Sequence, residues 1–463
     1  MKQNDPLKLK ENVKKYVDDK SDELISLSRK IWEYAEVALE EYKSSKLLAD
    51  VLEKDGFTVE RKVANLKTAF IASWGKGAPK IGVLAEYDAL PNLSAVERGK
   101  PGHACGHNLL GTAAVGSALA AKKAMEASNL SGTIRVYGCP SEENLYGKVM
   151  MASAKVFDDL DVALEWHPDT ITKSPYESMD ALDNKVFRFH GKSAHGSKAW
   201  EGKSALDAAQ IFTIAIEFNR EQIMEKDKIH YVITQGGSLP NIIPDFSEVW
   251  VFIRSPDMRH LMELTRKVDL CAIAASLATD TSVDIERKVA CHMLLPNKTI
   301  SLAVNDNLNS IGAPKLSDEE KKRVSKQLSQ KYGDYEEKVM PPTGWEVGGD
   351  WVGQAVSTDV GDVSWIVPTN GMFSVSIGPR GVPAHNADQT ILSGSSIGSK
   401  AMLVAAKTLG CTIVDLLTKP DIIVNAKKEF KKRKELSKWN YEPLLPSKIE
   451  YTKNDYVPKI SLL

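Results

Sequence analysis

Strand-like and helical segments alternate between residues 80 and 166 of this 463-residue chain. Apolar, strand-like runs cover 80–87, 133–139 and 161–166, and helical runs cover 109–126 and 147–156. A strand followed by a helix and then by another strand usually lies parallel to it in one sheet. The pattern therefore predicts an α/β fold, with a mostly parallel sheet covered by helices.

A second pattern begins near Asp183. Strand, helix, strand, strand, helix and strand follow one another, which is the order of a ferredoxin-like α+β unit. Because one hydrophobic core rarely serves so long a chain, we expect an α/β domain at 1–183 and 295–463, with a ferredoxin-like domain inserted at 184–294. The six segments are 186–190, 205–218, 229–234, 248–254, 260–275 and 282–286.

The remaining stretches predict further helices. Residues 8–54 predict two amphipathic helices, and 394–408 predict a helix rich in small side chains. The basic stretch 427–438 is interpreted as a solvated helix face rather than a nucleic-acid site.

Charge and cysteine content exclude several classes of protein. Lys and Arg total 60 and Asp and Glu total 61, so the chain lacks the basic excess of a nucleic-acid or membrane-surface protein. Five cysteines are too few, and too odd a number, for a disulfide framework, which favours a reduced, cytoplasmic location. The apolar runs are short or broken by charge, so we expect no membrane span and no signal peptide.

Cys105 and His107 stand two residues apart, just before a predicted helix. In an extended loop, such residues project to the same side. A thiolate and an imidazole so placed form half of a site for a transition metal. Taken alone this spacing is a weak signal, and a buried cysteine beside an ordinary loop histidine explains it as well.

Glu142 and Glu143 follow Pro140 at the end of a predicted strand. Adjacent carboxylates at such a position can take separate roles, so that one binds a metal while the other holds a water. Paired glutamates are more often plain surface charge. His167 and His385 also follow strand-like runs, and either one alone would be an ordinary loop histidine.

All these candidates, together with Asp88, lie at or soon after the carboxyl ends of predicted strands. In an open parallel sheet these ends share one edge, where ligands bind. One Cys, three His and one Glu exceed the three ligands of a typical catalytic zinc site, so they predict a two-metal site. A water held by the metals would attack an amide carbonyl, and Glu142, left off the metals, would act as general base. The five expected ligands are Cys105, His107, Glu143, His167 and His385.

Ordered motifs over roughly residues 20–415 resemble one known family. They are Ala85–Pro91, Gly102–Ala114, Gly138–Glu143, Val156–Asp159, Trp166–Pro168, Ser193–His195 and Ser357–Trp365. The chain resembles the dinuclear-metal aminoacylase and glutamate-carboxypeptidase family, and within it the amidohydrolase branch that includes aminobenzoyl-glutamate hydrolases. The block Gly-His-x-Cys-Gly-His-Asn is highly specific for that branch.

The resemblance implies metal-dependent hydrolysis of the amide bond of an N-acyl amino acid. It places two divalent ions, zinc or manganese, on the five ligands above, the general base on Glu142, and a supporting role behind the ligands on Asp88. It implies that the inserted domain dimerises and that its His195 reaches the neighbouring subunit's active site. Asn241 and Arg254 fall near the substrate carboxylate, although a loop cap and a strand-end ion pair would explain them equally well.

One segment departs from the family pattern. The aminobenzoyl-glutamate enzymes follow the paired glutamates with glycines, whereas this chain has Asn144-Leu145-Tyr146-Gly147. The change could reshape the pocket, so two substrate classes stay open: an aromatic acyl-glutamate such as p-aminobenzoyl-glutamate, or a dipeptide or other acyl-amino acid. A non-catalytic partner subunit of an active homologue is the alternative outside the enzymes. We expect a homodimer, or a heterodimer with a homologous subunit.

Overall fold

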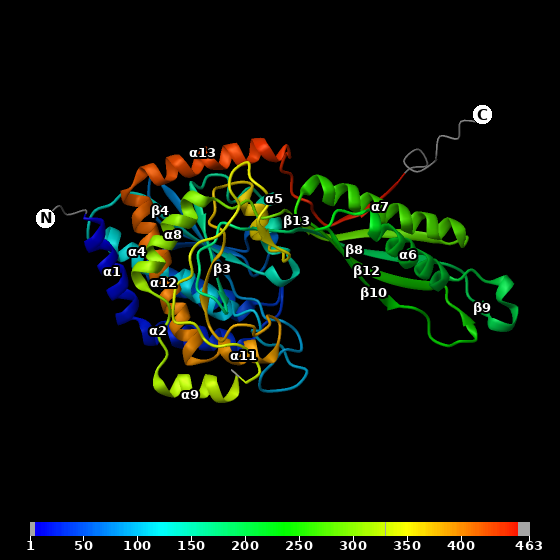
Figure 1. Cartoon of the computed structure of the whole chain (residues 1–463), viewed down its shortest axis with the longest axis horizontal. Coiled ribbons are helices and arrows are strands. Elements are labelled where there is room, and N and C mark those ends of the chain that lie inside the picture. The colour runs from blue at the N-terminus through cyan, green and yellow to red at the C-terminus, as the bar shows by residue number, and fades with distance from the viewer. Residues whose placement is uncertain (1–4, 329, 452–463) are drawn as a thin grey trace. The chain divides into compact units, whose positions relative to one another are not determined.

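The computed structural model describes residues 5–328 and 330–451, and the chain divides into two compact units (Figure 1). The first unit comprises Met1–Ser178, Leu294–Gln354 and Thr358–Tyr441. The second comprises Met179–Met293, Ala355–Ser357 and Glu442–Leu463. The predicted domain boundaries at 184 and 294 stay a prediction.

The strands of the first unit are β1 (Thr58–Arg61), β2 (Phe70–Lys76), β3 (Lys80–Glu86), β4 (Gly132–Cys139), β5 (Val162–Leu164), β6 (Trp166–Asp169), β14 (Gly353–Gln354) and β15 (Phe373–Ser376). Five of them form a sheet in the order β1-β2-β4-β3-β5. β3 runs parallel to both β4 and β5, and β6 runs parallel to β15. β2 is antiparallel to β4, and β1 is antiparallel to β2. Short links join β1 to β2 and β2 to β3, so the chain reverses its direction at each link. The α/β fold class is confirmed, with its parallel part in the middle of a mixed sheet.

The helices of this unit are α1 (Pro6–Asp19), α2 (Ser21–Tyr34), α3 (Tyr42–Lys54), α4 (His107–Glu126), α5 (Gly147–Ser153), α8 (Lys298–Ile311), α9 (Asp318–Gln327), α10 (Val360–Ser364), α11 (Ala387–Ser393), α12 (Ser396–Thr418) and α13 (Pro420–Ser437). α4 and α12 pack against each other, and α1 lies along both (Figure 1). Three helices cover residues 6–54, where the sequence predicted two. The predicted pair corresponds to α2 and α3, and the break at Lys20, the single residue between α1 and α2, was missed because neither glycine nor proline marks it.

α12 is long and apolar enough to cross a membrane by length and composition, so the expectation that no segment reaches that length was wrong. Its most apolar window is 72% buried inside the fold. This burial is typical of the core helix of a globular domain, where the apolar side chains pack against protein.

The basic stretch predicted at 427–438 lies in α13, as expected, but it is not solvated throughout. Arg433 is buried, and it donates hydrogen bonds to the Glu429 carboxylate at 2.8 Å and to the Trp345 carbonyl at 2.6 Å. Because its guanidinium is buried and paired, Arg433 contributes to the packing of the first unit and is not part of a solvated helix face.

The second unit contains the strands β8 (Ala181–His190), β10 (Lys228–Gln235), β12 (Phe246–Ser255), β13 (Ser282–Cys291) and β16 (Ser447–Ile449), the helices α6 (Ala205–Asn219) and α7 (Met258–Ala278), and the short strands β9 (Ala194–His195) and β11 (Ile242–Ile243). The two-residue strand β7 (Ser178–Met179) has one residue in each unit. Its sheet has the order β10-β12-β8-β13-β16, with antiparallel neighbours throughout. α6 and α7 pack against each other and against this sheet. The ferredoxin-like pattern is confirmed, and β16 adds an edge strand that the sequence pattern did not predict.

Candidate metal centre and active site

Cys105 and His107 are brought together by a left-handed glycine between them. Gly106 has φ +79° and is the residue from which α4 begins, so His107 is the first helical residue. A Cβ at this position would lie 2.8 Å from the Cγ atom of Pro168. The expectation of an extended loop was therefore wrong, because Gly106 turns the chain into the helix.

Asp88 holds the His107 ring from behind. The Nδ1 atom of His107 lies 2.8 Å from Oδ1 of Asp88, and both side chains are fully buried. The second oxygen of Asp88 accepts a hydrogen bond from the backbone N–H of Glu143 at 2.9 Å. With Nδ1 donating to Asp88, the Nε2 atom of His107 is left as an acceptor, which is the form that binds a metal.

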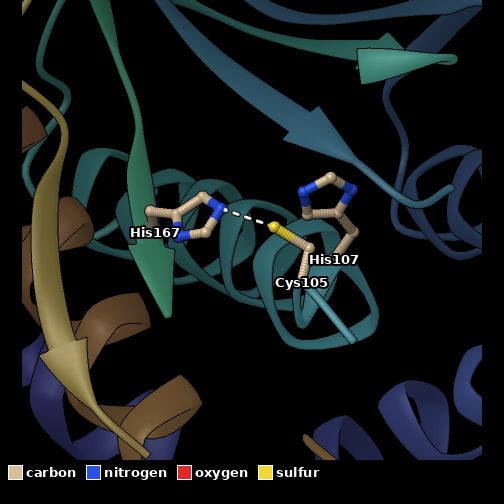
Figure 2. A group of neighbouring side chains, drawn as sticks. All are labelled: Cys105, His107 and His167. Atoms are coloured by element: carbon tan, nitrogen blue, oxygen red, sulfur yellow. Dashed lines mark hydrogen bonds between the residues drawn. The ribbon is translucent and has the colours of Figure 1, made fainter. Parts of the chain in front are cut away.

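Three further contacts bring the remaining candidates to the same place. Sγ of Cys105 lies 3.4 Å from Nε2 of His167, as Figure 2 shows. The other ring nitrogen of His167 is 2.7 Å from the Pro168 carbonyl, to which it can donate, so that Nε2 is also an acceptor. Nε2 of His385 lies 3.3 Å from Oε2 of Glu143.

The donor atoms sort into two sets that share one residue. In the first set, Cys105, His107 and His167 each offer an atom within 4.8 Å of the others. In the second set, Cys105, Glu143 and His385 do the same. Cys105 thus stands between two groups of three donors, and all five predicted ligands lie in the first unit.

The chemistry of these groups fits divalent cations. Nε2 of His107 and Oε1 of Glu143 are buried atoms without a hydrogen-bond partner among the residues that the structure describes, which is rare for polar atoms unless an ion or water binds them. Thiolate and imidazole favour zinc, and carboxylate also suits manganese. Burial raises the pKa of Cys105 well above its ordinary value and that of Glu143 to about 7. A bound cation would offset that cost by stabilising the deprotonated ligands.

Glu142 sits beside the ligands on a strained turn. Ser141 and Leu145, which flank the turn, have φ values of +60° and +56° although neither is glycine. Such residues cost free energy and persist where surrounding contacts hold them. Oε2 of Glu142 lies 3.9 Å from Nε2 of His107. Burial, followed by the charge of Glu86, raises the pKa of Glu142 well above its ordinary value.

Glu41 holds the start of this turn, and sequence reasoning missed it. The Glu41 side chain is fully buried; its Oε1 accepts a hydrogen bond from the Ser141 N–H at 2.9 Å, and its Oε2 accepts one from Thr68 at 2.9 Å. Glu41 is a hundred residues away from Ser141 in the chain. It belongs to a stretch whose pattern indicates only an amphipathic helix, so no local signal marked it.

Replacing Glu41 by Gln should change how stability depends on pH. Burial raises the pKa of Glu41 from its ordinary value of 4.5 to about 7. Between these values the unfolded chain has lost a proton that the folded protein keeps, so the free energy of unfolding falls as the pH rises, by up to about 3 kcal/mol. Glu41→Gln, which cannot ionise, should lack this fall when both proteins are unfolded in urea at pH 5 and pH 8. Parallel pH dependences of the two proteins would contradict the assignment.

Three predicted residues belong to the second unit. His195 is exposed in β9, and its Nδ1 lies 2.8 Å from the Ser197 hydroxyl. The Asn241 carbonyl accepts a hydrogen bond from the Gly196 N–H at 2.7 Å, so Asn241 lies next to His195. Arg254 donates to the Ser357 hydroxyl at 2.6 Å, and burial lowers its pKa. Their roles toward substrate stay predictions.

Comparison with known proteins places the chain in a family. No protein-family model matches it. Over 437 residues it is 37% identical to one of the subunits of p-aminobenzoyl-glutamate hydrolase from Escherichia coli (strain K12), covering 87% of this chain and 91% of that protein. The chain belongs to the dinuclear-metal aminoacylase and carboxypeptidase family. It is also 32% identical to the Xaa-Arg dipeptidase of Mus musculus, covering 91% of this chain and 92% of that protein.

Solved structures agree with this family fold. A dinuclear metal-binding peptidase of the M20 family from Bacillus subtilis superposes with a TM-score of 0.57 at 18% identity, covering 86% of this chain and 99% of that one. An aminobenzoyl-glutamate utilization protein from Klebsiella pneumoniae superposes with a TM-score of 0.59 at 14% identity, covering 87% of this chain and 97% of that one. The predicted enzyme class is confirmed: this member of the family is a metal-dependent amide-bond hydrolase.

Proposed function

We propose that this enzyme hydrolyses the amide bond of an N-acyl amino acid, with an aromatic acyl-glutamate such as p-aminobenzoyl-glutamate as its substrate. One observation carries the proposal: two sets of three metal donors share Cys105, with Glu142 beside them. The identity to a p-aminobenzoyl-glutamate hydrolase supports the substrate class. In this proposal the ligands of two divalent ions are Cys105, His107, Glu143, His167 and His385.

The proposed division of labour follows from the positions of the side chains. Two bound divalent ions would polarise the substrate carbonyl and make water more acidic. Glu142 takes a proton from the water whose oxygen forms the new bond to the carbonyl carbon, and delivers that proton to the nitrogen as the C–N bond breaks. Its buried setting suits both steps, because a raised pKa lets a carboxylate hold a proton near neutral pH. Asp88 keeps His107 in the tautomer that presents Nε2.

The second candidate function is a dipeptidase on the same site. It is favoured by the 32% identity to the Xaa-Arg dipeptidase and by the bulky residues that follow the paired glutamates. Metal-loaded protein should be assayed against p-aminobenzoyl-glutamate, aliphatic acyl-glutamates, β-alanyl dipeptides and dipeptides that end in arginine. A kcat/KM at least about tenfold higher for p-aminobenzoyl-glutamate is expected, and a higher value for any dipeptide would favour the second candidate.

We propose zinc or manganese as the metal, and a reduced cytoplasmic location. All five cysteines are free, and Cys105 can bind a metal only as an unoxidised thiolate. Metal analysis of the purified protein should give close to two ions per subunit. A well-folded chain that holds none would favour the non-catalytic partner subunit.

We propose that the second unit pairs with another copy of this chain. α6 exposes Ile211, Ile214 and Phe218, and the edge strand β10 exposes Val232 and Ile233. An edge strand with apolar side chains is a ready surface for pairing between subunits. The proposed alternative is a heterodimer with a homologous subunit.

Charge placed on this surface should separate the subunits. The double variant Phe218→Lys and Val232→Lys is expected to shift the purified protein from dimer to monomer in light scattering, because lysine cannot be buried there unpaired. Leu277→Lys, on the exposed side of α7, is the matched control and should leave the dimer intact. A double variant that stays dimeric would place the interface elsewhere.

A further inference from the structure

Lys148 is a fully buried lysine that the proposed reaction does not use. It lies on α5, and its Nζ atom contacts Oε1 of Glu86 and, at 2.6 Å, Oδ1 of Asp359. Its backbone N–H donates to the other oxygen of Asp359 at 2.8 Å. Glu165 Oε1 lies 4.0 Å from the same amine. These carboxylates are all buried, and all belong to the first unit.

The charges of this cluster do not balance. Three buried carboxylates face a single amine, and burying a charge without a partner is strongly unfavourable. Lys148 binds one oxygen of Glu86, and the other, Oε2, has no hydrogen-bond partner within residues 5–328 and 330–451. The cluster therefore presents a fixed, buried and unsatisfied carboxylate oxygen.

That oxygen faces the proposed metal centre. Oε2 of Glu86 lies 3.3 Å from Nε2 of His107, an atom that also lacks a hydrogen-bond partner. Nδ1 of His107 lies against Asp88, so in the neutral ring Nε2 is an acceptor, and two acceptor atoms then lie side by side inside the protein. Glu86, His107 and Glu142 each offer an atom within 4.8 Å of the others. A cation near both acceptors would satisfy them together.

The close packing of α4 against β3 fixes the positions of Glu86 and His107 relative to each other. α4, which begins with His107, approaches the end of β3 so closely that a Cβ at Gly111 would lie 2.5 Å from the Glu86 carbonyl oxygen. The strand that carries Glu86 and the helix that carries His107 are thus held together at the level of these side chains.

We propose that Glu86 is a further metal ligand of the centre, binding through Oε2 the cation that His107 holds, while Lys148 fixes its other oxygen. The inference rests on the proposed metal centre. It explains why Glu86 and Asp359 lie in two of the family motifs although neither is among the five expected ligands. Asp359 positions Lys148, and through Lys148 it positions Glu86.

The direct test is a structure of the wild-type protein crystallised with zinc. Oε2 of Glu86 is expected about 2.0–2.2 Å from an ion that also binds His107. An ion bound to His107 with Glu86 more than about 3.5 Å away would overturn the inference and leave the proposed centre standing. A zinc-soaked protein with no ion on His107 would overturn both.

Variants give an independent measurement in solution. Glu86→Gln keeps the shape of the side chain, and it should weaken the binding of one of the two zinc ions by about tenfold or more in competition with a chelator. Glu177→Gln is the matched control, since Glu177 is a partly buried carboxylate of the same unit that lies outside the Lys148 cluster and outside every donor set. It should leave both affinities within about twofold of wild type.

Cobalt substitution separates ligation from a general effect of charge. The ligand-field bands of the cobalt-loaded protein should change in Glu86→Gln and stay unchanged in Glu177→Gln, while the charge-transfer band from the Cys105 thiolate persists in both. Unchanged ligand-field bands in Glu86→Gln would overturn the inference. Glu86→Asp, which keeps the charge but shortens the side chain, provides the same readout if Glu86→Gln folds poorly.

Discussion

Glu142→Gln is expected to lower kcat by about 10²–10⁴-fold, the usual contribution of a general acid–base residue. Glutamine keeps the size of the side chain but cannot take a proton from water or return one to the leaving nitrogen. The metal content should stay at the wild-type value, because Glu142 belongs to neither donor set that contains Cys105. Steady-state kinetics on metal-loaded protein, together with metal analysis, measure both quantities.

The matched control for this variant is Glu177→Gln. Glu177 is a partly buried carboxylate of the same unit that accepts a hydrogen bond from Thr343 at 2.6 Å and lies outside every donor set. Its replacement should leave kcat near the wild-type value. If Glu142→Gln keeps full activity with a normal metal content, Glu142 is not the general base and the mechanism proposed above fails.

Cys105→Ala is expected to remove both metal ions and, with them, the activity. Cys105 is the residue that the two donor sets share, so its loss leaves each set with two protein donors. Replacing groups that only support a ligand already costs about 10–100-fold in metal affinity, and loss of a shared ligand should exceed that. Metal analysis after dialysis and the kcat/KM of the dialysed protein test the prediction.

Cys411→Ala is the control for Cys105. Cys411 is also a buried cysteine of the first unit, on α12, and its Sγ donates a hydrogen bond to the Lys10 carbonyl, at 3.8 Å. The control should keep two ions and full activity. Retention of one ion by Cys105→Ala would show that the two sets do not share this residue, and retention of both would exclude it as a ligand.

Much of the centre was predictable because its residues follow strands in chain order. Asp88 comes after β3, Glu142 and Glu143 come after β4, His167 lies in β6, and His385 comes after β15. Parallel strands place their carboxyl ends at one edge, so a local pattern of apolar runs was enough to group the side chains that follow β3 and β4. His167 is the second residue of β6, which pairs with β15 in a separate two-stranded sheet, so the strand-end argument does not cover it. The same local patterns predicted the ferredoxin-like unit, whose elements are long enough to show their period.

Contacts between distant segments could not be predicted in this way. Glu41 meets Ser141, and Lys148 meets Asp359, across gaps of 100 and 211 residues. A buried carboxylate and a buried lysine have no periodic pattern that distinguishes them from surface charge. Their burial depends on how α3 and α5 pack, and therefore on the whole fold.

The order of strands and the spacing of Cys, His and Glu along the chain were sufficient to predict an α/β metallohydrolase and five candidate metal donors, which the fold brings close together, because these depend on local periodicity and donor chemistry. The grouping of the donors into two sets around Cys105, the turn into α4 at Gly106, and the approach of Glu86 to His107 came from packing. Distances of a few ångströms between these side chains depend on how separate helices and strands pack against each other. The sequence of one such element does not specify its distance to another.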